Sequence, residues 1–248
     1  MTSFKFGQIL FGIAMVAVGI VNLIFGDFLA GLIPVSPAAP GRQFFMYVVS
    51  VLLMGSGVAI VWEKQVWIAA ITLAVLFLVL LVLVHLPRNM ANLYDGGAWT
   101  GTFEMLALCS GALIIADALP GELRAGSGWI FLIQAGQYLY AISLAVFAFQ
   151  HFIYADFITT LIPTWIPARL FWAYFVGGAF IASAASIALN KKLSLAMILL
   201  ATMFFLWILV LHLPRSIASP QHEPEWTSTL VALTMGSIAL MLQRKHGR

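Results

Sequence analysis

The sequence predicts an all-α, polytopic membrane protein with eight transmembrane helices arranged as two parallel-repeat four-helix bundles. Three observations lead to this fold class. The chain is 62% hydrophobic and only 8% charged, whereas soluble domains carry roughly 25% charged residues. Its apolar runs have the length of membrane spans, and its second half repeats its first. Such a surface faces lipid, so the lipid bilayer is the expected environment.

Eight apolar runs supply the predicted spans in chain order. A span needs about 20 apolar residues, and backbone polar groups in lipid must be paired within the segment, so runs of this length form helices. The first run lacks a small-x-small cleavage site, and we interpret it as a span rather than a signal peptide. We expect spans at 6–25, 43–62, 66–85, 99–118, 129–150, 169–189, 193–212 and 226–243.

Ordered motifs recur at a nearly constant offset along the chain. "GQILFGI" at 7–13 matches "GQYLYAI" at 136–142, and "FGDFLAGLIP" at 25–34 matches "YADFITTLIP" at 154–163, in both cases 129 residues later. After a loop that is two residues shorter, "HLPR" at 85–88 matches "HLPR" at 212–215 at an offset of 127. This pattern indicates an internal duplication of a four-span unit. We predict repeats at 1–118 and 129–248, joined by a linker at 119–128.

The charges favour one orientation. Because four spans per repeat is an even number, both repeats enter the membrane from the same side, related by a pseudo-two-fold axis along the membrane normal. The positive-inside bias then places both termini in the cytoplasm, with the chain in the inner (plasma) membrane. The terminal side holds eight basic residues: Lys5, Lys64, Arg124, Lys191, Lys192, Arg244, Lys245 and Arg248. The other side holds four: Arg42, Arg88, Arg169 and Arg215.

Two of these arginines are expected to pair with aspartates across a loop. Asp27 follows the first helix and Arg42 opens the second, and the helix dipole disfavours each charge at that place. Together they neutralise one another, and Asp156 with Arg169 repeats the arrangement in the second half. A loop-locking ion pair is the first interpretation, and a ligand-binding charge is the alternative.

The repeated His-Leu-Pro-Arg is the main candidate site. Pro87 should end the helix at or near His85, because the residue before a proline is disfavoured in helical conformation. A helix C-terminus favours a cationic imidazole, and histidine changes charge near neutral pH. Each repeat therefore offers an imidazole and a guanidinium at the outer boundary, His85 with Arg88 and His212 with Arg215. Such a pair can hold a quinone carbonyl, an anion or a lipid headgroup; the alternative is a helix stop whose polar side chains snorkel to the interface.

Glu104 breaks the symmetry, since Val231 stands at the equivalent position. With His85 it can form a short proton relay; the alternative is a satisfied interhelical hydrogen bond. The acidic residues of the outer loops, Asp95, Glu223 and Glu225, are expected to be solvated.

The sequence argues against several cofactors and partners. Haem between His85 and His212 is disfavoured, because both abut a proline and neither half offers a second deep histidine. We find no ligand cluster for a metal, and the single Cys109 excludes a disulfide or a cysteine-bound cluster. A net charge of +3 over 248 residues gives no nucleic-acid patch.

The motifs "FGDF…LIP…GR" and "HLPR", set in a four-span unit, resemble the DoxX-like membrane family, here as a tandem duplication covering nearly the whole chain. The resemblance implies a quinone-linked or redox-partner role, because some relatives act in redox chemistry: the DoxD-type subunit of thiosulfate:quinone oxidoreductase, and a membrane oxidoreductase complex with superoxide dismutase. The chain departs from the narrower pattern in lacking a thiol pair and a glutamate in its second span.

The expected function is therefore ligand binding at periplasm-facing polar pockets. The ligand would be a small amphipathic or anionic molecule, with quinone a candidate cofactor, or the pockets would dock a membrane redox partner protein. A small-molecule transporter and a structural subunit of a larger membrane complex are the alternatives. A transporter is disfavoured because the polar residues lie near one face rather than the midplane, and a structural subunit would fill the pockets with its own loops. No catalytic constellation is found, so no enzyme activity is assigned.

Overall fold

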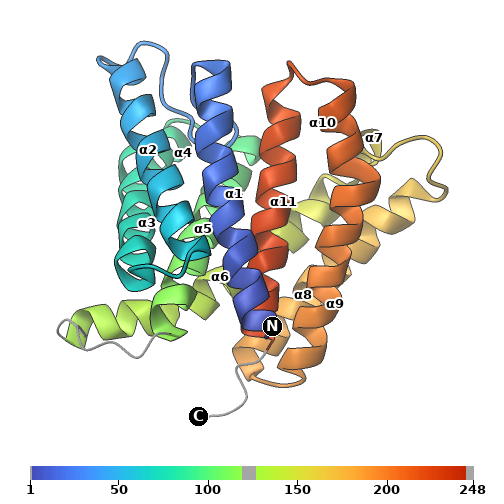
Figure 1. Ribbon diagram of the computed structural model, residues 1–248. Coiled ribbons are helices and arrows are strands. Elements are labelled where there is room, and N and C mark those ends of the chain that lie inside the picture. Colours follow the sequence, from blue (N-terminus) through green and yellow to red (C-terminus); the bar gives the residue numbers. More distant parts are fainter. Residues whose placement is uncertain (1, 119–126, 244–248) are drawn as a thin grey trace.

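All of the regular secondary structure is helical in the residues that the structure, a computed structural model, describes: 2–118 and 127–243 (Figure 1). Most of the predicted linker at 119–128 lies outside the described residues, as do Arg124, Arg244, Lys245 and Arg248 of the charge comparison. Eight helices are long and apolar enough to cross a membrane, which confirms the predicted fold class.

The first four spans come from α1 (Ser3–Phe25), α2 (Arg42–Val61), α3 (Val66–Leu80) and α5 (Gly96–Ala118). The last four come from α6 (Ser127–Ile153), α8 (Arg169–Leu189), α9 (Leu193–Trp207) and α11 (Glu223–Leu242). Two spans continue beyond these bounds, α3 through the π-helical turn η1 (Leu81–His85) into α4 (Leu86–Ala91), and α9 through η2 (Ile208–His212) into α10 (Leu213–Ala218). The short helix α7 (Ala155–Leu161) lies in the loop before α8.

The two repeats meet through an exchange of neighbours. Within each repeat consecutive helices pack side by side, whereas α1 packs against α11 and α6 packs against α5. Each repeat thus places its first helix on the last helix of the other, as a two-fold relation requires. Both ends of the described chain lie at the same end of the helices (Figure 1). We call the opposite end, which carries α4, α7 and α10, the outer face.

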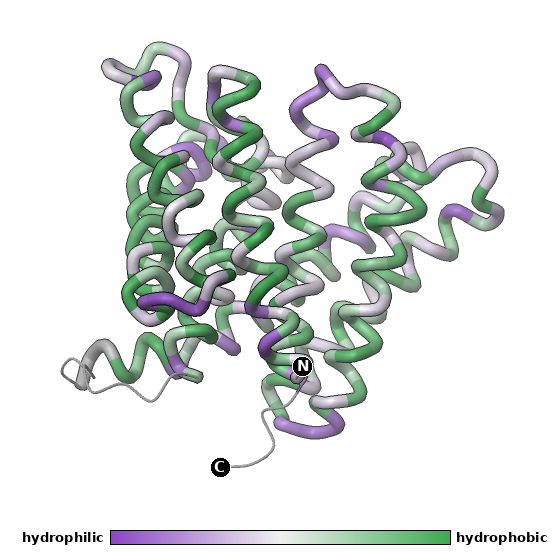
Figure 2. The backbone as a smooth tube through the Cα atoms, in the orientation of Figure 1, coloured by the Kyte–Doolittle hydropathy of each residue, from purple (hydrophilic) through white to green (hydrophobic). Residues whose placement is uncertain are grey.

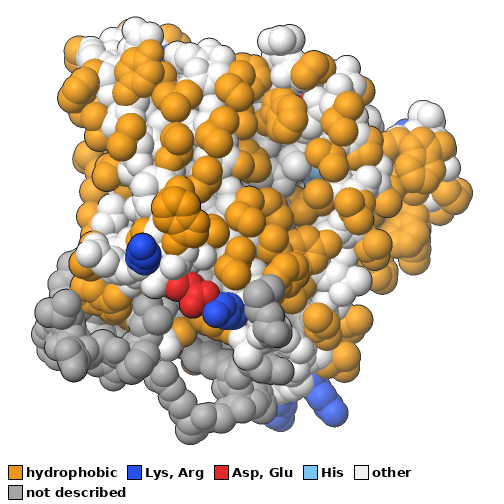
Figure 3. Space-filling view, in the orientation of Figure 1, with side chains coloured by type: hydrophobic (Ala, Val, Ile, Leu, Met, Phe, Trp, Pro, Cys, Tyr) orange, Lys and Arg blue, Asp and Glu red, His pale blue; other side chains and the backbone are white. Residues whose placement is uncertain are grey.

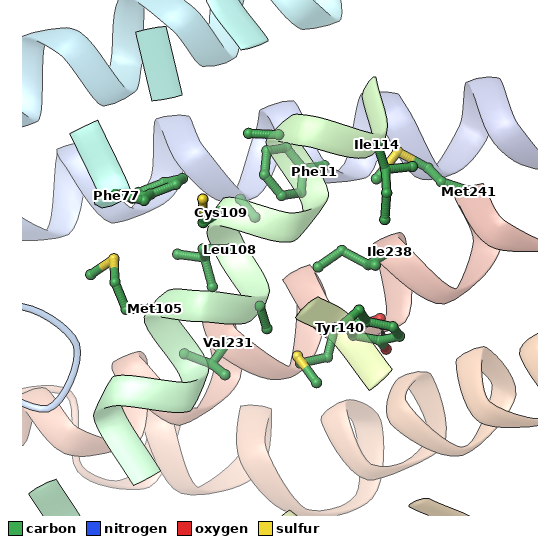
Figure 4. Close-up of a cluster of buried hydrophobic side chains, with 14 of the residues drawn as sticks. Phe11, Phe77, Met105, Leu108, Cys109, Ile114, Tyr140, Val231, Ile238 and Met241 are labelled. Carbon is green, nitrogen blue, oxygen red and sulfur yellow. Dashed lines mark hydrogen bonds between the residues drawn. The ribbon is translucent and has the colours of Figure 1, made fainter. Parts of the chain in front are cut away.

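Burial separates a central layer from a lipid-facing one. In the spanning part of α11, 83% of the residues are buried, against 33% in α8 and in α9. Phe11 and Tyr140 occupy equivalent positions, are fully buried (Figure 4), and belong to the same central cluster. Tyr140 donates its hydroxyl to the carbonyl of Met235 at 2.8 Å, so this polar atom is satisfied across the interface between repeats. Figure 2 shows hydrophilic residues gathered near the helix ends, and Figure 3 shows a mainly hydrophobic outer surface between them.

The prediction that Pro87 ends its helix is wrong. Leu86 is helical, with φ −60° and ψ −48°, and the helix continues to Ala91. The five residues before it form a π-helical turn, whose wider ring accommodates the missing proline N–H and the pyrrolidine ring. The same turn precedes Pro214. His85 and His212 therefore lie at π-turns inside longer helices, rather than at helix ends.

Candidate functional site

The outer polar cluster of the first repeat is closed by the protein's own groups. His85 is buried, with 1% of its surface exposed, and its Nε2 lies 3.0 Å from the carbonyl oxygen of Leu32. Because a carbonyl only accepts, Nε2 carries the hydrogen. Nδ1 is then an acceptor for the hydroxyl of Thr102 at 3.3 Å. That hydroxyl also has the Ala98 carbonyl as an acceptor at 2.8 Å, and it accepts a hydrogen bond from Asn89 Nδ2 at 2.8 Å. Both ring nitrogens are thus occupied.

The loop after α1 is held tightly against α5. Asn22 Oδ1 accepts a hydrogen bond from the backbone N–H of Leu29 at 3.0 Å, which fixes the start of the loop. A Cβ atom at Gly101 would lie 2.7 Å from the carbonyl oxygen of Gly31. Only glycine at position 101 allows this close approach, and the approach brings the Leu32 carbonyl onto His85.

The second repeat uses the equivalent atoms differently. The carbonyl of Leu161, equivalent to that of Leu32, accepts from Arg215 Nη1 at 3.1 Å. The hydroxyl of Thr229, equivalent to that of Thr102, lies 2.8 Å from Ser216 Oγ. In the second repeat, the equivalents of the two groups that contact His85 are therefore engaged by other residues. The buried Nδ1 of His212 has no hydrogen-bond partner among the residues that the structure describes.

Arg215 forms the strongest charged contact of this cluster. Its Nη2 donates to Glu225 Oε1 at 2.7 Å, and the Glu225 side chain is only 11% exposed. The carboxylate lies in the first turn of α11, where the helix dipole favours a negative charge. The expectation that Glu225 is solvated is wrong, because α11 starts earlier than predicted and carries this residue into the interior.

Of the two predicted loop-locking ion pairs, one is confirmed. Arg42 Nη1 is ion-paired with Asp27 Oδ1, and Arg42 Nε also donates to the Val35 carbonyl at 3.3 Å. The pair between Arg169 and Asp156 is wrong. Within the described ranges Arg169 donates instead to the Thr159 carbonyl at 3.3 Å, and Asp156 is exposed in the first turn of α7. The coiling of residues 155–161 into a helix turns this carboxylate away from the arginine.

The remaining predicted site residues make no hydrogen bond to the two histidines within the described residues. Arg88 Nη2 is 3.8 Å from Asp95 Oδ2, and both side chains are partly exposed. Asp95 Oδ1 also accepts from the backbone N–H of Ala98 at 3.0 Å, so it caps α5. Glu104 follows Thr102, the residue that contacts His85, by two positions, which is about 200° around an α-helix. The structure does not bring Glu104 and His85 together in a relay.

A long apolar groove lies between α8 and α9 (labelled in Figure 1). Its volume is about 630 Å³, within the range of small-molecule sites, about 300–1,000 Å³. Lining side chains such as Phe175 and Leu199 are 49% and 61% exposed on the lipid-facing surface. The groove is lined mainly by aromatic and aliphatic residues, among them Trp165, Trp172, Phe175, Ala179, Leu206 and Trp207.

The groove runs along the helices toward the outer face. On α8 the lining residues Trp172, Phe175, Ala179 and Ala182 fall on one face, since residues three or four apart lie above one another. Ten residues of α-helix span about 15 Å, so the lined stretch covers about half of the roughly 30 Å hydrocarbon core. Trp172 and Trp207 both line the groove and contact each other edge to face, with ring centroids 6.0 Å apart.

The residues at equivalent positions of the first repeat differ. Leu52 stands where Ala179 stands in the second repeat, and Phe45 and Leu80 stand where Trp172 and Trp207 stand. The smaller Ala179 leaves space that a leucine would occupy, and the two tryptophans provide broad walls. The two repeats thus differ in the residues that stand at the groove positions.

No protein-family model, curated protein or solved structure matches the chain. Among the described residues, no group of three or more His, Cys, Asp or Glu side chains is placed to hold a metal ion.

Sequence reasoning missed the partners of the histidines and the groove. Asn89 and Ser216 are both small polar residues at equivalent positions, as are Thr102 and Thr229. This recurrence, at the same offset as the repeated motif, is the signal that identifies them. The signal for the groove is the replacement of Leu52 by Ala179 between two aligned spans.

Proposed function

We propose that this chain is an integral membrane protein that binds a small amphipathic molecule from the bilayer in the groove between α8 and α9. The observation that supports the proposal most is the groove itself, which is apolar, of ligand size and open toward lipid. A hydrocarbon tail fits such a lining, and the aromatic walls add contact area with little conformational freedom to lose.

The outer face of the second repeat suits the polar end of the same molecule. Trp165 and Ile166 line the groove from the loop before α8, so one end of the groove reaches the membrane interface. Isoprenoid quinones and acyl lipids both combine such a tail with an oxygen-bearing head. The resemblance to the DoxX-like family, which remains a prediction, favours the quinone class. A redox partner protein and the inner membrane likewise remain part of the proposal.

The first repeat fits a structural role. For that half of the chain, the alternative of a structural subunit therefore stays a prediction. Its histidine is saturated by Leu32 and Thr102, so the loop fills the place that a ligand head would take. The binding roles predicted for His85 and Arg88 therefore receive less support than a role in locking the loop. His212 keeps an unpartnered nitrogen, and its predicted ligand contact stays a prediction.

The test is native mass spectrometry of the full chain in detergent, titrated with three probes: oleate, oleoyl-lysophosphatidylcholine and a short-isoprenoid benzoquinone. Ala179→Leu introduces the residue of the first repeat and should weaken binding of the favoured probe about tenfold, because the added side chain occupies the groove. Ala185→Leu is the matched control, since Ala185 is exposed on the same helix and does not line the groove. Wild-type binding by Ala179→Leu would contradict the proposal.

A further inference from the structure

A cation stands at the outer end of the groove. Arg169 is the first residue of α8, three positions before Trp172, which lines the groove. Residues three apart on a helix share a face. Arg169 therefore lies almost one turn above the groove's aromatic wall, close in sequence to Trp165 and Ile166.

This cation is less neutralised than its equivalent in the first repeat. Arg42 has the carboxylate of Asp27 as its ion-pair partner. Arg169 has no carboxylate partner in the described part of the chain; its one hydrogen bond goes from Nη1 to the Thr159 carbonyl. A guanidinium has five N–H donors in a fixed fork, so donors remain for another acceptor. The second repeat thus differs from the first in two respects at neighbouring positions, the side chains at the groove positions and an arginine without a carboxylate partner among the described residues.

We infer that the occupant of the groove is an anionic lipid whose phosphate or carboxylate is held by Arg169. The inference rests on the proposed function, since the tail must first occupy the groove, and it assigns an acidic head in place of the quinone head that the family resemblance favours. Guanidinium binds phosphate and carboxylate oxygens through paired hydrogen bonds, which a neutral quinone head cannot match. An anionic phospholipid and a free fatty acid share this chemistry.

The experiment compares the affinities of probes that share the oleoyl chain but differ in head group. The full chain in detergent is titrated with dioleoyl-phosphatidylglycerol, dioleoyl-phosphatidylcholine and oleate, and the bound fractions are measured by native mass spectrometry. Wild-type protein should bind phosphatidylglycerol or oleate about tenfold more tightly than phosphatidylcholine, because the choline cation of phosphatidylcholine neutralises its phosphate and repels Arg169. A higher affinity for phosphatidylglycerol identifies a phospholipid site, and a higher affinity for oleate identifies a fatty-acid site.

Two variants of one residue isolate the charge. Arg169→Gln keeps a donor for the Thr159 carbonyl but should bring the anionic probes down to the affinity of phosphatidylcholine, which itself stays unchanged. Arg169→Lys should retain most of the preference, because the positive charge remains. Arg88→Gln removes another outer-face arginine and serves as the control, expected to leave all three affinities unchanged.

The outcomes separate this inference from the proposed function. An anionic preference that survives Arg169→Gln, or no preference in the wild type, would overturn the head-group assignment while leaving tail binding intact. Should a variant fail to fold, brominated acyl chains test the wild type directly, because bromine quenches nearby tryptophan. Quenching should then be stronger for brominated phosphatidylglycerol than for brominated phosphatidylcholine, and replacing the three groove tryptophans together, Trp165, Trp172 and Trp207, by Phe should remove that difference. Equal quenching by the two lipids would overturn the inference.

Discussion

Arg42 and Asp27 are ion-paired across the loop that joins α1 to α2. The equivalent arginine, Arg169, binds a backbone carbonyl instead, because the chain before it coils into α7 and leaves Asp156 exposed. The outer loop of the first repeat is therefore held by an ion pair. In the second repeat the equivalent arginine has no such pair among the described residues and lies near an apolar groove. This divergence between equivalent positions is the basis of the functional proposal.

The ion pair should contribute measurably to stability. Arg42→Ala removes the partner of Asp27 and one hydrogen bond to the loop, and we expect a loss of about 0.5–1 kcal/mol, as for other partly exposed pairs. The midpoint of thermal unfolding in detergent measures it. Arg169→Ala is the matched control and should cost less, since it breaks no ion pair. An unchanged midpoint for Arg42→Ala would count against the pair.

The two repeated histidines should respond unequally to the same substitution. His85→Ala leaves the Leu32 carbonyl and the Thr102 hydroxyl without their imidazole partner inside the protein, at a cost of about 1–3 kcal/mol. His212→Ala removes a side chain whose Nδ1 makes no hydrogen bond and should destabilise less. Thermal unfolding of the two variants, compared side by side, measures the difference. Equal losses would show that the two clusters are energetically alike.

The close packing of the outer loop on α5 can be tested by replacing the glycine at the contact. Gly101→Ala places a methyl group 2.7 Å from the Gly31 carbonyl oxygen, and relieving that overlap should cost about 1–3 kcal/mol. Gly55→Ala in α2 is the control, because no atom lies within 4 Å of its added Cβ and alanine is the better helix former by about 1 kcal/mol. The unfolding midpoint should fall for the first and hold or rise for the second. A rise for both would mean that the loop moves freely.

The orientation of the chain follows from its basic residues. Lys5, Lys64, Lys191 and Lys192 lie toward the terminal face, and from the positive-inside bias we predict that this face lies in the cytoplasm. A reporter fused after residue 248 should be active only in its cytoplasmic form. Activity of a periplasmic reporter at this position would reverse the topology.

The spans and the duplication could be predicted from the sequence because lipid imposes them directly. A segment in hydrocarbon must be apolar and must satisfy its own backbone, so hydropathy alone locates α1 and α2 to within a few residues. The pairing of Asp27 with Arg42 was also predictable, since both charges flank one short loop and oppose the local helix dipoles.

The parts that were missed depend on local geometry that periodicity does not encode. The rule for the residue before proline assumes a regular α-helix, and the π-turns at 81–85 and 208–212 change the backbone pairing on which it rests. Asp27 and Asp156 stand at equivalent positions of the motif, yet only the loop that contains Asp156 coils into a helix. The groove is lined by side chains of two helices, α8 and α9, and its small residues, such as Ala179, leave space only where the two helices pack together.

A density map of the protein, purified in discs of its own membrane lipid, tests the central claim most directly. We predict elongated non-protein density in the α8–α9 groove, lying along Trp172 and Trp207, with its head near Arg169. An empty groove, or density of that kind between α2 and α3 instead, would contradict it.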